Sequence, residues 1–137
     1  MRPIKFRAWD KKKSDWIYLL ENTRYFLNMT SGNVFDDKWS EYLGADAEQF
    51  IGLEDRNGTE IYEGDIVLMD EEAKVYPGKK LVIEYSFGIP MARPVDSRFY
   101  VGDAHELCVD HLGNHKPKHG VAGMVIGNIH ENPELLV

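Results

Sequence analysis

Near its start the chain alternates between two kinds of position. Residues 4–9 place Ile4, Phe6 and Ala8 on one side of an extended strand. Lys5, Arg7 and Trp9 lie on the second side. A short polar stretch follows, and residues 16–20 are again rich in β-branched and aromatic side chains. Two such runs joined by a polar turn are typical of a β-hairpin, which we therefore predict for the first twenty residues.

The pattern between residues 21 and 50 is weaker. Residues 33–35 predict a short strand. Residues 36–43 carry capping side chains and a Trp39/Leu43 spacing that allow one or two helical turns. We expect this segment to contribute little regular structure.

The later part of the chain predicts several short strands separated by turns. The strands are expected at residues 50–53, 61–62, 66–69, 81–85, 98–101 and 124–130. Asn57 and Gly58 tolerate the positive φ angles of a tight turn, and Gly64 supplies a bend before a buried run. Gly88, Pro90 and Pro94 predict a loop.

This spacing of strands and turns indicates a mainly β fold, α+β at most. Short strands divided by Gly and Pro turns favour a small barrel or sandwich over a βαβ architecture. A chain of 137 residues, 43% of them hydrophobic, is long enough for one packed core with a small appendage. We predict an N-terminal region at 1–48 with the hairpin and a barrel domain at 49–137, together forming one compact unit.

Composition restricts the cellular setting. Cys108 is the single cysteine, so no internal disulfide is possible. No run approaches the length of about 18 apolar residues that a membrane span needs, and the first residues lack the apolar run of a secretory signal. We expect a cytoplasmic protein without membrane contact.

The net charge of −7 is distributed unevenly. Residues 1–13 carry six basic groups and one acid, whereas residues 14–72 carry three basic groups and fifteen acids. Nucleic acid is bound largely through its phosphates, so the acidic middle disfavours it as a partner. The acidic block suits a decoy of a phosphate backbone or a docking surface for a basic partner, and a solvated exterior is the simpler interpretation.

Three separated motifs resemble the YopX family of phage and prophage proteins. They are IKFRAWD at residues 4–10, QFIGLEDRNGTEIYEGDIV at residues 49–67 and VIGNIHENPELL at residues 125–136. The family commonly has an aromatic residue where His130 stands. The resemblance implies a mostly β protein with an SH3-like barrel in its later part, encoded by phage or prophage and acting in the host cytosol. It implies no chemistry.

The clearest candidates for chemistry lie in one segment. Four of the five histidines and the only cysteine fall within fifteen residues, at His105, Cys108, His111, His115 and His119. Imidazole and thiolate are ligands that zinc and copper prefer. The spacing matches no established metal motif, and Gly113, Pro117 and Gly120 disfavour a helix that would align the histidines. An exposed loop is the favoured interpretation, with no resident metal or cofactor.

Few other residues qualify as binding candidates. Lys11, Lys12 and Lys13 could grip phosphate, although lysines in a hairpin turn also protect a sheet edge. Asp65 could be a carboxylate in a pocket, but a side chain accepting backbone N–H bonds in the bend is the simpler interpretation. Tyr100 could stack on a base. Signatures of phosphate loops, dinucleotide sites and nucleophile elbows are absent from the sequence.

Three hypotheses follow for the function. The first is a non-enzymatic interaction or regulatory module that binds a protein partner of host or phage and forms a homo-oligomer, because its basic and acidic blocks attract each other between subunits. The alternative is a nucleic-acid-binding module on the barrel, with Tyr100 as stacking platform and basic groups gathered by folding: Lys11–Lys13, Arg93, Arg98, Lys116 and Lys118. The third is a metal-dependent enzyme at the histidine-rich segment.

Overall fold

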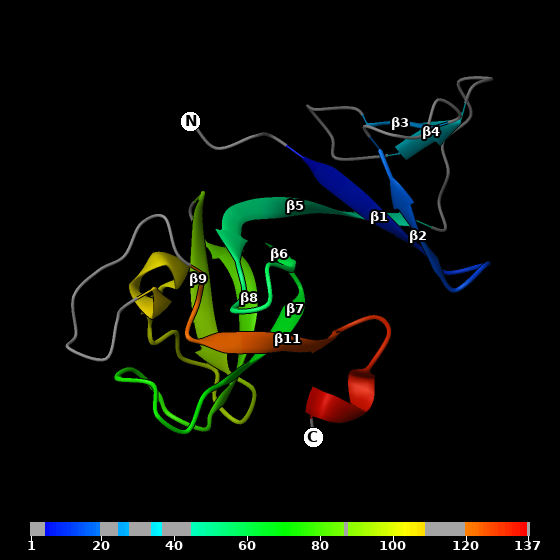
Figure 1. Cartoon of the computed structure of the whole chain (residues 1–137). Helices are drawn as coiled ribbons and strands as arrows, with labels where there is room; N and C mark the ends of the chain where they lie inside the picture. The colour runs from blue at the N-terminus through cyan, green and yellow to red at the C-terminus, as the bar shows by residue number, and fades with distance from the viewer. Residues whose placement is uncertain are drawn as a thin grey trace. The chain divides into compact units, whose positions relative to one another are not determined.

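Antiparallel β-strands make up nearly all the regular structure in the described part of the chain (Figure 1). The computed structural model describes residues 5–19, 25–27, 34–36, 45–86, 88–108 and 120–136. The chain divides into two compact units, Met1–Phe50 and Ile51–Val137. Within the described residues the only helical segments are two short 3-10 turns, so the predicted mainly β fold is confirmed.

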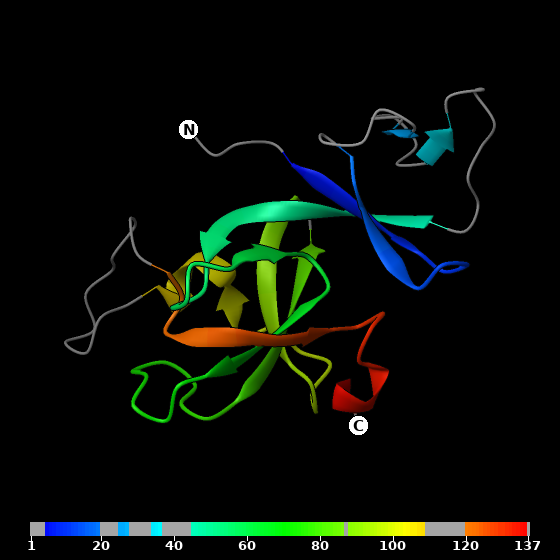
Figure 2. The same ribbon diagram turned by 45° about the vertical axis from the view of Figure 1, so that its right-hand side comes forward.

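The first unit is organised by the predicted hairpin. Strand β1 (Phe6–Asp10) pairs antiparallel with β2 (Asp15–Tyr18), as the blue ribbons of Figure 2 show. In this register Trp9 lies opposite Trp16. Strand β5 (Ala45–Glu54) pairs with the other edge of β1. Alternation then directs Ala8 and Ile17 to one face, where they are buried together with Val34.

A second, smaller strand pair belongs to the same unit. Strand β3 (Tyr25–Leu27) pairs antiparallel with β4 (Val34–Asp36), which confirms the short strand predicted there. The helical turns predicted for residues 36–43 begin on a residue that instead ends β4. The remainder of that prediction lies outside the described residues.

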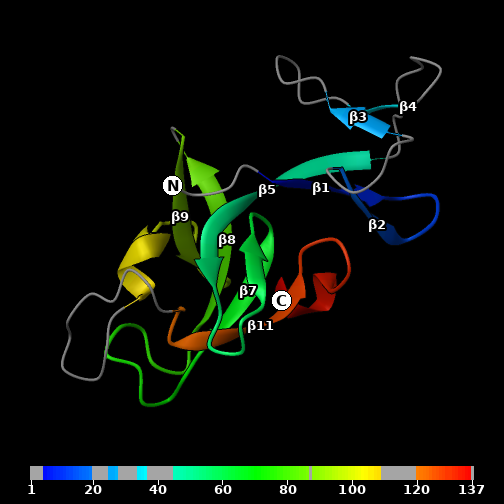
Figure 3. The ribbon, with the colours of Figure 1, turned by 45° about the horizontal axis from the view of Figure 1, so that its top comes forward.

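The second unit is built on a curled five-stranded sheet. Its order is β10 (Gly102–Asp103), β9 (Ile89–Pro94), β8 (Lys80–Ser86), β7 (Asp65–Met69) and β11 (Gly123–Asn128), as Figure 3 shows for the last four. Strand β6 (Glu60–Tyr62) pairs with the end of β5. The main hydrophobic cluster described in this unit contains Ile51, Leu53, Ile61, Val67, Met69, Leu81, Ile83, Ala92, Ala104, Leu107, Cys108 and Val121.

Glycine residues allow two tight connections between strands of this unit. Gly58 has a φ of 81° in the turn between β5 and β6, and Gly64 has a φ of 85° in the bend that opens β7. Both angles lie in the left-handed region that L side chains rarely adopt. Gly64 also ties two strands together, because its N–H donates to Ile83 and its carbonyl accepts from Ile129. The turn and the bend that the sequence predicts are both confirmed.

The loop predicted from Gly88, Pro90 and Pro94 is wrong, because Ile89–Pro94 forms β9. Val95 N–H donates to the Lys80 carbonyl, and this bond fixes which residues of β9 point their N–H groups toward β8. By alternation, the nitrogens of both prolines face the opposite side, where β10 pairs only with Met91 and Ala92. The missing N–H groups therefore cost no ladder bond.

The strand predicted at residues 98–101 is also wrong. The chain there is irregular, and only Gly102–Asp103 pairs with β9 as β10. A 3-10 turn, η1 (Ala104–Leu107), follows directly and is capped by the Asp103 carboxylate. A second 3-10 turn, η2 (Pro133–Leu136), ends the described chain. Among the described residues no helix has the length and apolar character to cross a membrane.

Candidate functional site

A groove with an apolar floor lies on the second unit, beside the paired ends of β7 and β11. Its volume is about 400 Å³. We call Leu68 and Met124 the floor of the groove, because these two apolar lining residues are paired across the strands and are both half-buried. The groove is lined by Arg56, Leu68, Met69, Asp70, Glu71, Glu72 and Met124.

The sequence places this groove through close strand approach. An added Cβ on Gly123 would lie 2.5 Å from the Leu68 carbonyl oxygen, so only glycine lets β11 come this near to β7. Gly123 also accepts a hydrogen bond from the Arg56 backbone N–H at 3.0 Å. The turn after β5 is thereby fastened beside the floor.

We call the charged lining residues the rim of the groove: Arg56, Asp70, Glu71 and Glu72. The Arg56 guanidinium lies 3.2 Å from the Asp70 carboxylate and donates to the Met124 sulfur at 3.1 Å. Glu71 and Glu72 are exposed on the same rim. Three carboxylates against one guanidinium leave the rim with an excess of negative charge.

This arrangement is suited to long cationic side chains. The apolar stem of a lysine or arginine can pack on Leu68 and Met124, while its charged head can reach carboxylates of the lining. Methionine adds an adaptable, polarizable surface to the floor. The groove therefore combines an apolar surface with an excess of carboxylates.

The lysines that the sequence singled out lie on the first unit. Lys11, Lys12 and Lys13 form the exposed turn between β1 and β2. Its backbone is held by Asp10, whose Oδ1 accepts from the N–H groups of Lys12 at 2.9 Å and Lys13 at 3.2 Å. Asp10 itself is buried, so the turn presents its lysines from a fixed base.

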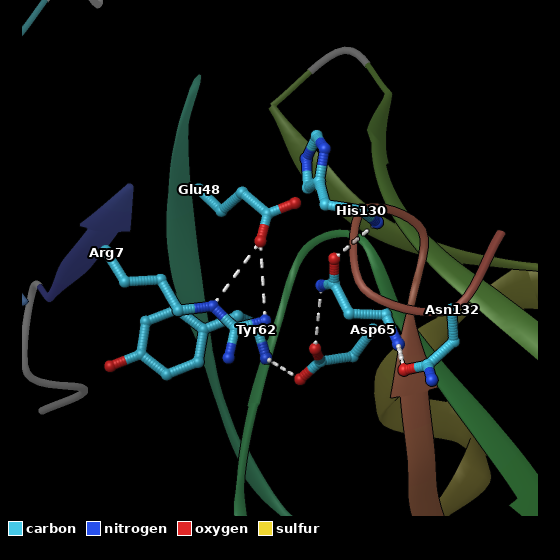
Figure 4. A network of polar contacts seen from close by, with 7 residues as sticks. Arg7, Glu48, Tyr62, Asp65, His130 and Asn132 are labelled. Atoms are coloured by element: carbon cyan, nitrogen blue, oxygen red, sulfur yellow. Dashed lines mark hydrogen bonds and ion pairs between the residues drawn. The ribbon is translucent and has the colours of Figure 1, made fainter. Parts of the chain in front are cut away.

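Asp65 is buried and engaged in the bend where the sequence places it (Figure 4). Its Oδ2 accepts from the Tyr62 backbone N–H at 2.9 Å, and its Oδ1 accepts from Asn128 Nδ2 at 3.0 Å. Asn128 in turn accepts from the His130 backbone N–H at 2.8 Å. The carboxylate thus joins the start of β7 to the end of β11, which is a structural task.

A second buried carboxylate, which the sequence did not single out, does similar work. Asp55 accepts hydrogen bonds from the backbone N–H groups of Asn57, Thr59 and Val125. It therefore closes the Asn-Gly turn and attaches that turn to β11. Only the Asp-x-Asn-Gly order hints at this role, because an aspartate at the first position of such a turn commonly accepts local N–H bonds.

A buried ion pair organises the first unit, as the other half of Figure 4 shows. Arg7 donates to Glu48 Oε1 from Nε at 3.4 Å and from Nη2 at 3.3 Å. The Arg7 guanidinium also lies over the Trp16 ring, 3.8 Å from its centroid. The Trp9 and Trp16 rings meet edge to face with centroids 5.0 Å apart.

Tyr100 belongs to a small polar cluster on the second unit. Its hydroxyl donates to Glu84 Oε2 at 2.9 Å, and this hydrogen bond raises the pKa of the Tyr100 phenol. Arg93 lies 2.6 Å from the same carboxylate and also donates to the Ser97 carbonyl. Two of the groups expected to contact nucleic acid, Tyr100 and Arg93, are thus bonded to an acid.

The neighbouring Phe99 is the most exposed large apolar side chain described, at 71%. The Arg98 guanidinium lies 5.6 Å from the centroid of its ring. This aromatic platform was missed from sequence, where Phe99 was assigned to a strand. The other basic groups of that hypothesis, Lys116 and Lys118, lie outside the described residues.

The histidine-rich segment is described only in part. His105 Nδ1 lies 2.8 Å from Asp103 Oδ1, and His111, His115 and His119 lie outside the described residues. Cys108 is buried in the core, and burial raises the pKa of its thiol to about 11. Within the described ranges no three His, Cys, Asp or Glu side chains are grouped to hold a metal ion.

These features define a class: a two-unit, mainly β protein with a curled antiparallel sheet and an acid-rimmed groove. The family model described as YopX protein matches residues 5–137, and the chain belongs to the YopX family. The fold is similar to the crystal structure of protein EF1440 from Enterococcus faecalis, with 25% sequence identity, complete coverage of both chains and a TM-score of 0.57. No curated protein matches the chain.

Proposed function

We propose that this YopX-family chain is a non-enzymatic interaction module that binds a protein partner through the groove beside β7 and β11. The observation that carries the proposal is the apolar floor of Leu68 and Met124 under an acidic rim. Such a surface complements a basic segment in both its apolar stems and its charged heads. The partner is therefore a protein that exposes lysine or arginine side chains.

The non-enzymatic part of the proposal rests on the roles of the candidate reactive groups. Asp65 is committed to backbone and amide donors that hold two strands together. The Cys108 thiol is buried with a raised pKa, which disfavours the thiolate that a nucleophile needs. Membership of the YopX family supports a phage or prophage origin and a site of action in the bacterial cytoplasm.

Binding of a basic probe tests this proposal directly. The probe is a short fluorescein-labelled peptide of alternating lysine and alanine, followed by fluorescence anisotropy against the full chain. We expect saturable binding that weakens with salt, because screening reduces charge pairing at the rim. The double substitution Glu71→Lys, Glu72→Lys reverses the rim charge and is expected to weaken binding about tenfold or more.

A matched control separates the groove from bulk charge. Asp96→Lys with Glu106→Lys makes the same charge change at two exposed acids outside the groove. This variant is expected to bind the probe nearly as well as the unaltered chain. Equal losses in both variants, or no binding by the unaltered chain, would contradict the proposal.

Nucleic-acid binding is a second candidate function, supported by one observation. The exposed Phe99 ring with the Arg98 guanidinium beside it resembles the stacking platforms that bind single strands. Stacking of a base on such a ring contributes about 1–3 kcal/mol. The remaining aromatic and basic groups nearby are bonded to Glu84, so the platform is small.

A gel-shift assay with a single-stranded oligothymidine at low salt tests this second candidate. Retardation that is lost in Phe99→Ala and kept in Phe99→Trp would support stacking at this ring. Absence of retardation in the unaltered chain would remove the candidate. Neither outcome depends on the groove, because Phe99 does not line it.

A further inference from the structure

We infer that the basic segment received by the groove is the Lys11–Lys13 turn of a second copy of this chain. The inference rests on the proposed function, because it names the partner of the same groove. The chain has both surfaces: an exposed turn with three lysines and a groove lined by three carboxylates. Each copy thus offers one donor surface and one acceptor surface.

The turn is built as a rigid projection. Asp10 holds the N–H groups of Lys12 and Lys13, and Ser14 closes the turn with a φ of 51°. Below it, the edge-to-face pair of Trp9 and Trp16 stiffens the strands. A preorganised turn loses little conformational freedom on binding, which favours association.

The sequence-wide charge pattern agrees with this docking. Residues 1–13 carry six basic groups and one acid, whereas residues 14–72 carry fifteen acids and three basic groups. Like charges on the two surfaces would repel, so opposite charges both attract the correct contact and set its orientation. Lysine stems also match the apolar floor of Leu68 and Met124.

The proposed contact joins two different surfaces, and this determines the kinds of oligomer that can form. A turn of one copy in the groove of the next is a heterologous contact, since the two surfaces differ. Such contacts close into a ring or continue as an open chain. Association is therefore expected to depend on concentration and to weaken strongly at high salt.

Charge reversal on the full chain provides the test, read by light scattering on a sizing column at about 50 mM and about 500 mM NaCl. One variant reverses the turn: Lys11→Glu, Lys12→Glu and Lys13→Glu. The other reverses the rim: Glu71→Lys and Glu72→Lys. Each variant alone is expected to lose self-association, with the dissociation constant rising about tenfold or more.

Complementation then identifies the contact. Mixing the two variants restores opposite charges at both kinds of contact, so mixed oligomers are expected to form. Combining all five substitutions in one chain is expected to restore self-association for the same reason. Asp96→Lys with Glu106→Lys serves as the charge-matched control for the rim variant and should leave association unchanged. Circular dichroism checks that each variant is folded.

Several outcomes would overturn the inference. An unaltered chain that stays monomeric at all concentrations and both salts refutes it, as does association that survives rim reversal. Failure of the two variants to complement each other also refutes it. If the chain is monomeric while the lysine peptide still binds in a Glu71- and Glu72-dependent manner, self-docking fails and the proposed function stands. If the peptide does not bind either, both fail.

Discussion

The two units of the chain are stabilised in different ways. Among the described residues, the hydrophobic cluster of the second unit contains twelve buried side chains, whereas that of the first contains Ala8, Ile17 and Val34. The first unit adds a buried Arg7–Glu48 pair and a tryptophan pair to this small core. Because hydrophobic burial is the main favourable term in folding, we expect the second unit to be the more stable one.

The two units also differ in what they support: the second unit holds the groove, and the first unit holds the lysine turn. In the second unit, the large core fixes the strand pair whose outer face carries the groove. In the first unit, polar and aromatic contacts hold a hairpin whose turn exposes three lysines. Binding residues are commonly placed on turns and strand ends that a rigid scaffold supports.

Truncation in the two cores is expected to have the largest effect. Ile83 is fully buried in the second unit, and Ile83→Ala is expected to lower the free energy of unfolding by about 4 kcal/mol through lost burial and a residual cavity. Ile17→Ala, in the smaller core, is expected to cost about 2 kcal/mol. Urea unfolding followed by tryptophan fluorescence and circular dichroism measures both.

The exposed Ile89 provides the control for these truncations. Ile89→Ala removes the same atoms at a position that is 46% exposed, and it should change stability by less than about 0.5 kcal/mol. An equal cost at Ile17 and Ile83 would break the proposed difference between the two units. Separate transitions for the two probes would sharpen it, because all three tryptophans lie in the first unit.

Much of this architecture could be predicted from hydrophobic pattern alone. Alternation in residues 4–9 and the polar turn after them identified the hairpin, and the Asn-Gly pair and Gly64 identified two connections. The prediction was wrong at β9 because each proline was taken to break a strand wherever it stands. Whether a proline breaks a ladder depends on which way its nitrogen faces, and the register decides that.

Removing one partner of the buried ion pair is expected to have the next largest effect. Arg7→Leu takes away a guanidinium that contacts both Glu48 and the Trp16 ring, and we expect a cost of about 3 kcal/mol. The double variant with Glu48→Leu should cost less than the sum of the two single changes, since no charge stays buried without this partner.

Additive costs in that double-mutant cycle would show that the two side chains act independently. Lys13→Leu makes a matched removal of positive charge at an exposed position and should cost less than about 0.5 kcal/mol. The free energy of unfolding is measured in urea for the four chains of the cycle and for Lys13→Leu. A coupling energy near zero would mean that the first unit relies on its small apolar core.

Substitution of Asp65 tests the hydrogen bonds through which this carboxylate joins β7 to β11. In Asp65→Asn, one of the two oxygens becomes an amide N–H group that must face either the Tyr62 N–H or the Asn128 amide donor. Two donors cannot share a hydrogen bond, so we expect a loss of about 2 kcal/mol. Asp96→Asn, at an exposed position, should be nearly neutral, and equal costs would contradict this role.

The candidate groove was less accessible to sequence reasoning than the fold. The run Asp70–Glu72 was interpreted as charge at the end of a strand, and nothing local linked it to Arg56 or Met124. Those residues come together only through the β7–β11 register and the close approach that Gly123 permits. By contrast, the local spacing of Gly64 and Asp65 was sufficient to suggest the bend role of the carboxylate.

The pH dependence of stability that Cys108 causes is the smallest effect we expect. Because this thiol is buried, its ionisation tests whether the core of the second unit stays closed. Its thiol pKa is raised by burial from 9.0 to about 11, so below pH 9 the thiol is neutral in both the folded and the unfolded chain. Between pH 9 and 11 the unfolded thiol ionises while the folded one stays neutral, so the free energy of unfolding falls as pH rises. The loss reaches at most about 2 kcal/mol near pH 11.

The variant Cys108→Ala isolates this contribution from the lysines and tyrosines that titrate in the same range. Its stability should fall less steeply between pH 9 and 11, while below pH 9 the two curves should run parallel. Labelling with dithionitrobenzoate at about pH 8 gives a second measurement, because a buried neutral thiol reacts slowly until the chain unfolds. Rapid labelling of the native chain would show that this core opens readily and would remove the contrast in stability between the two units.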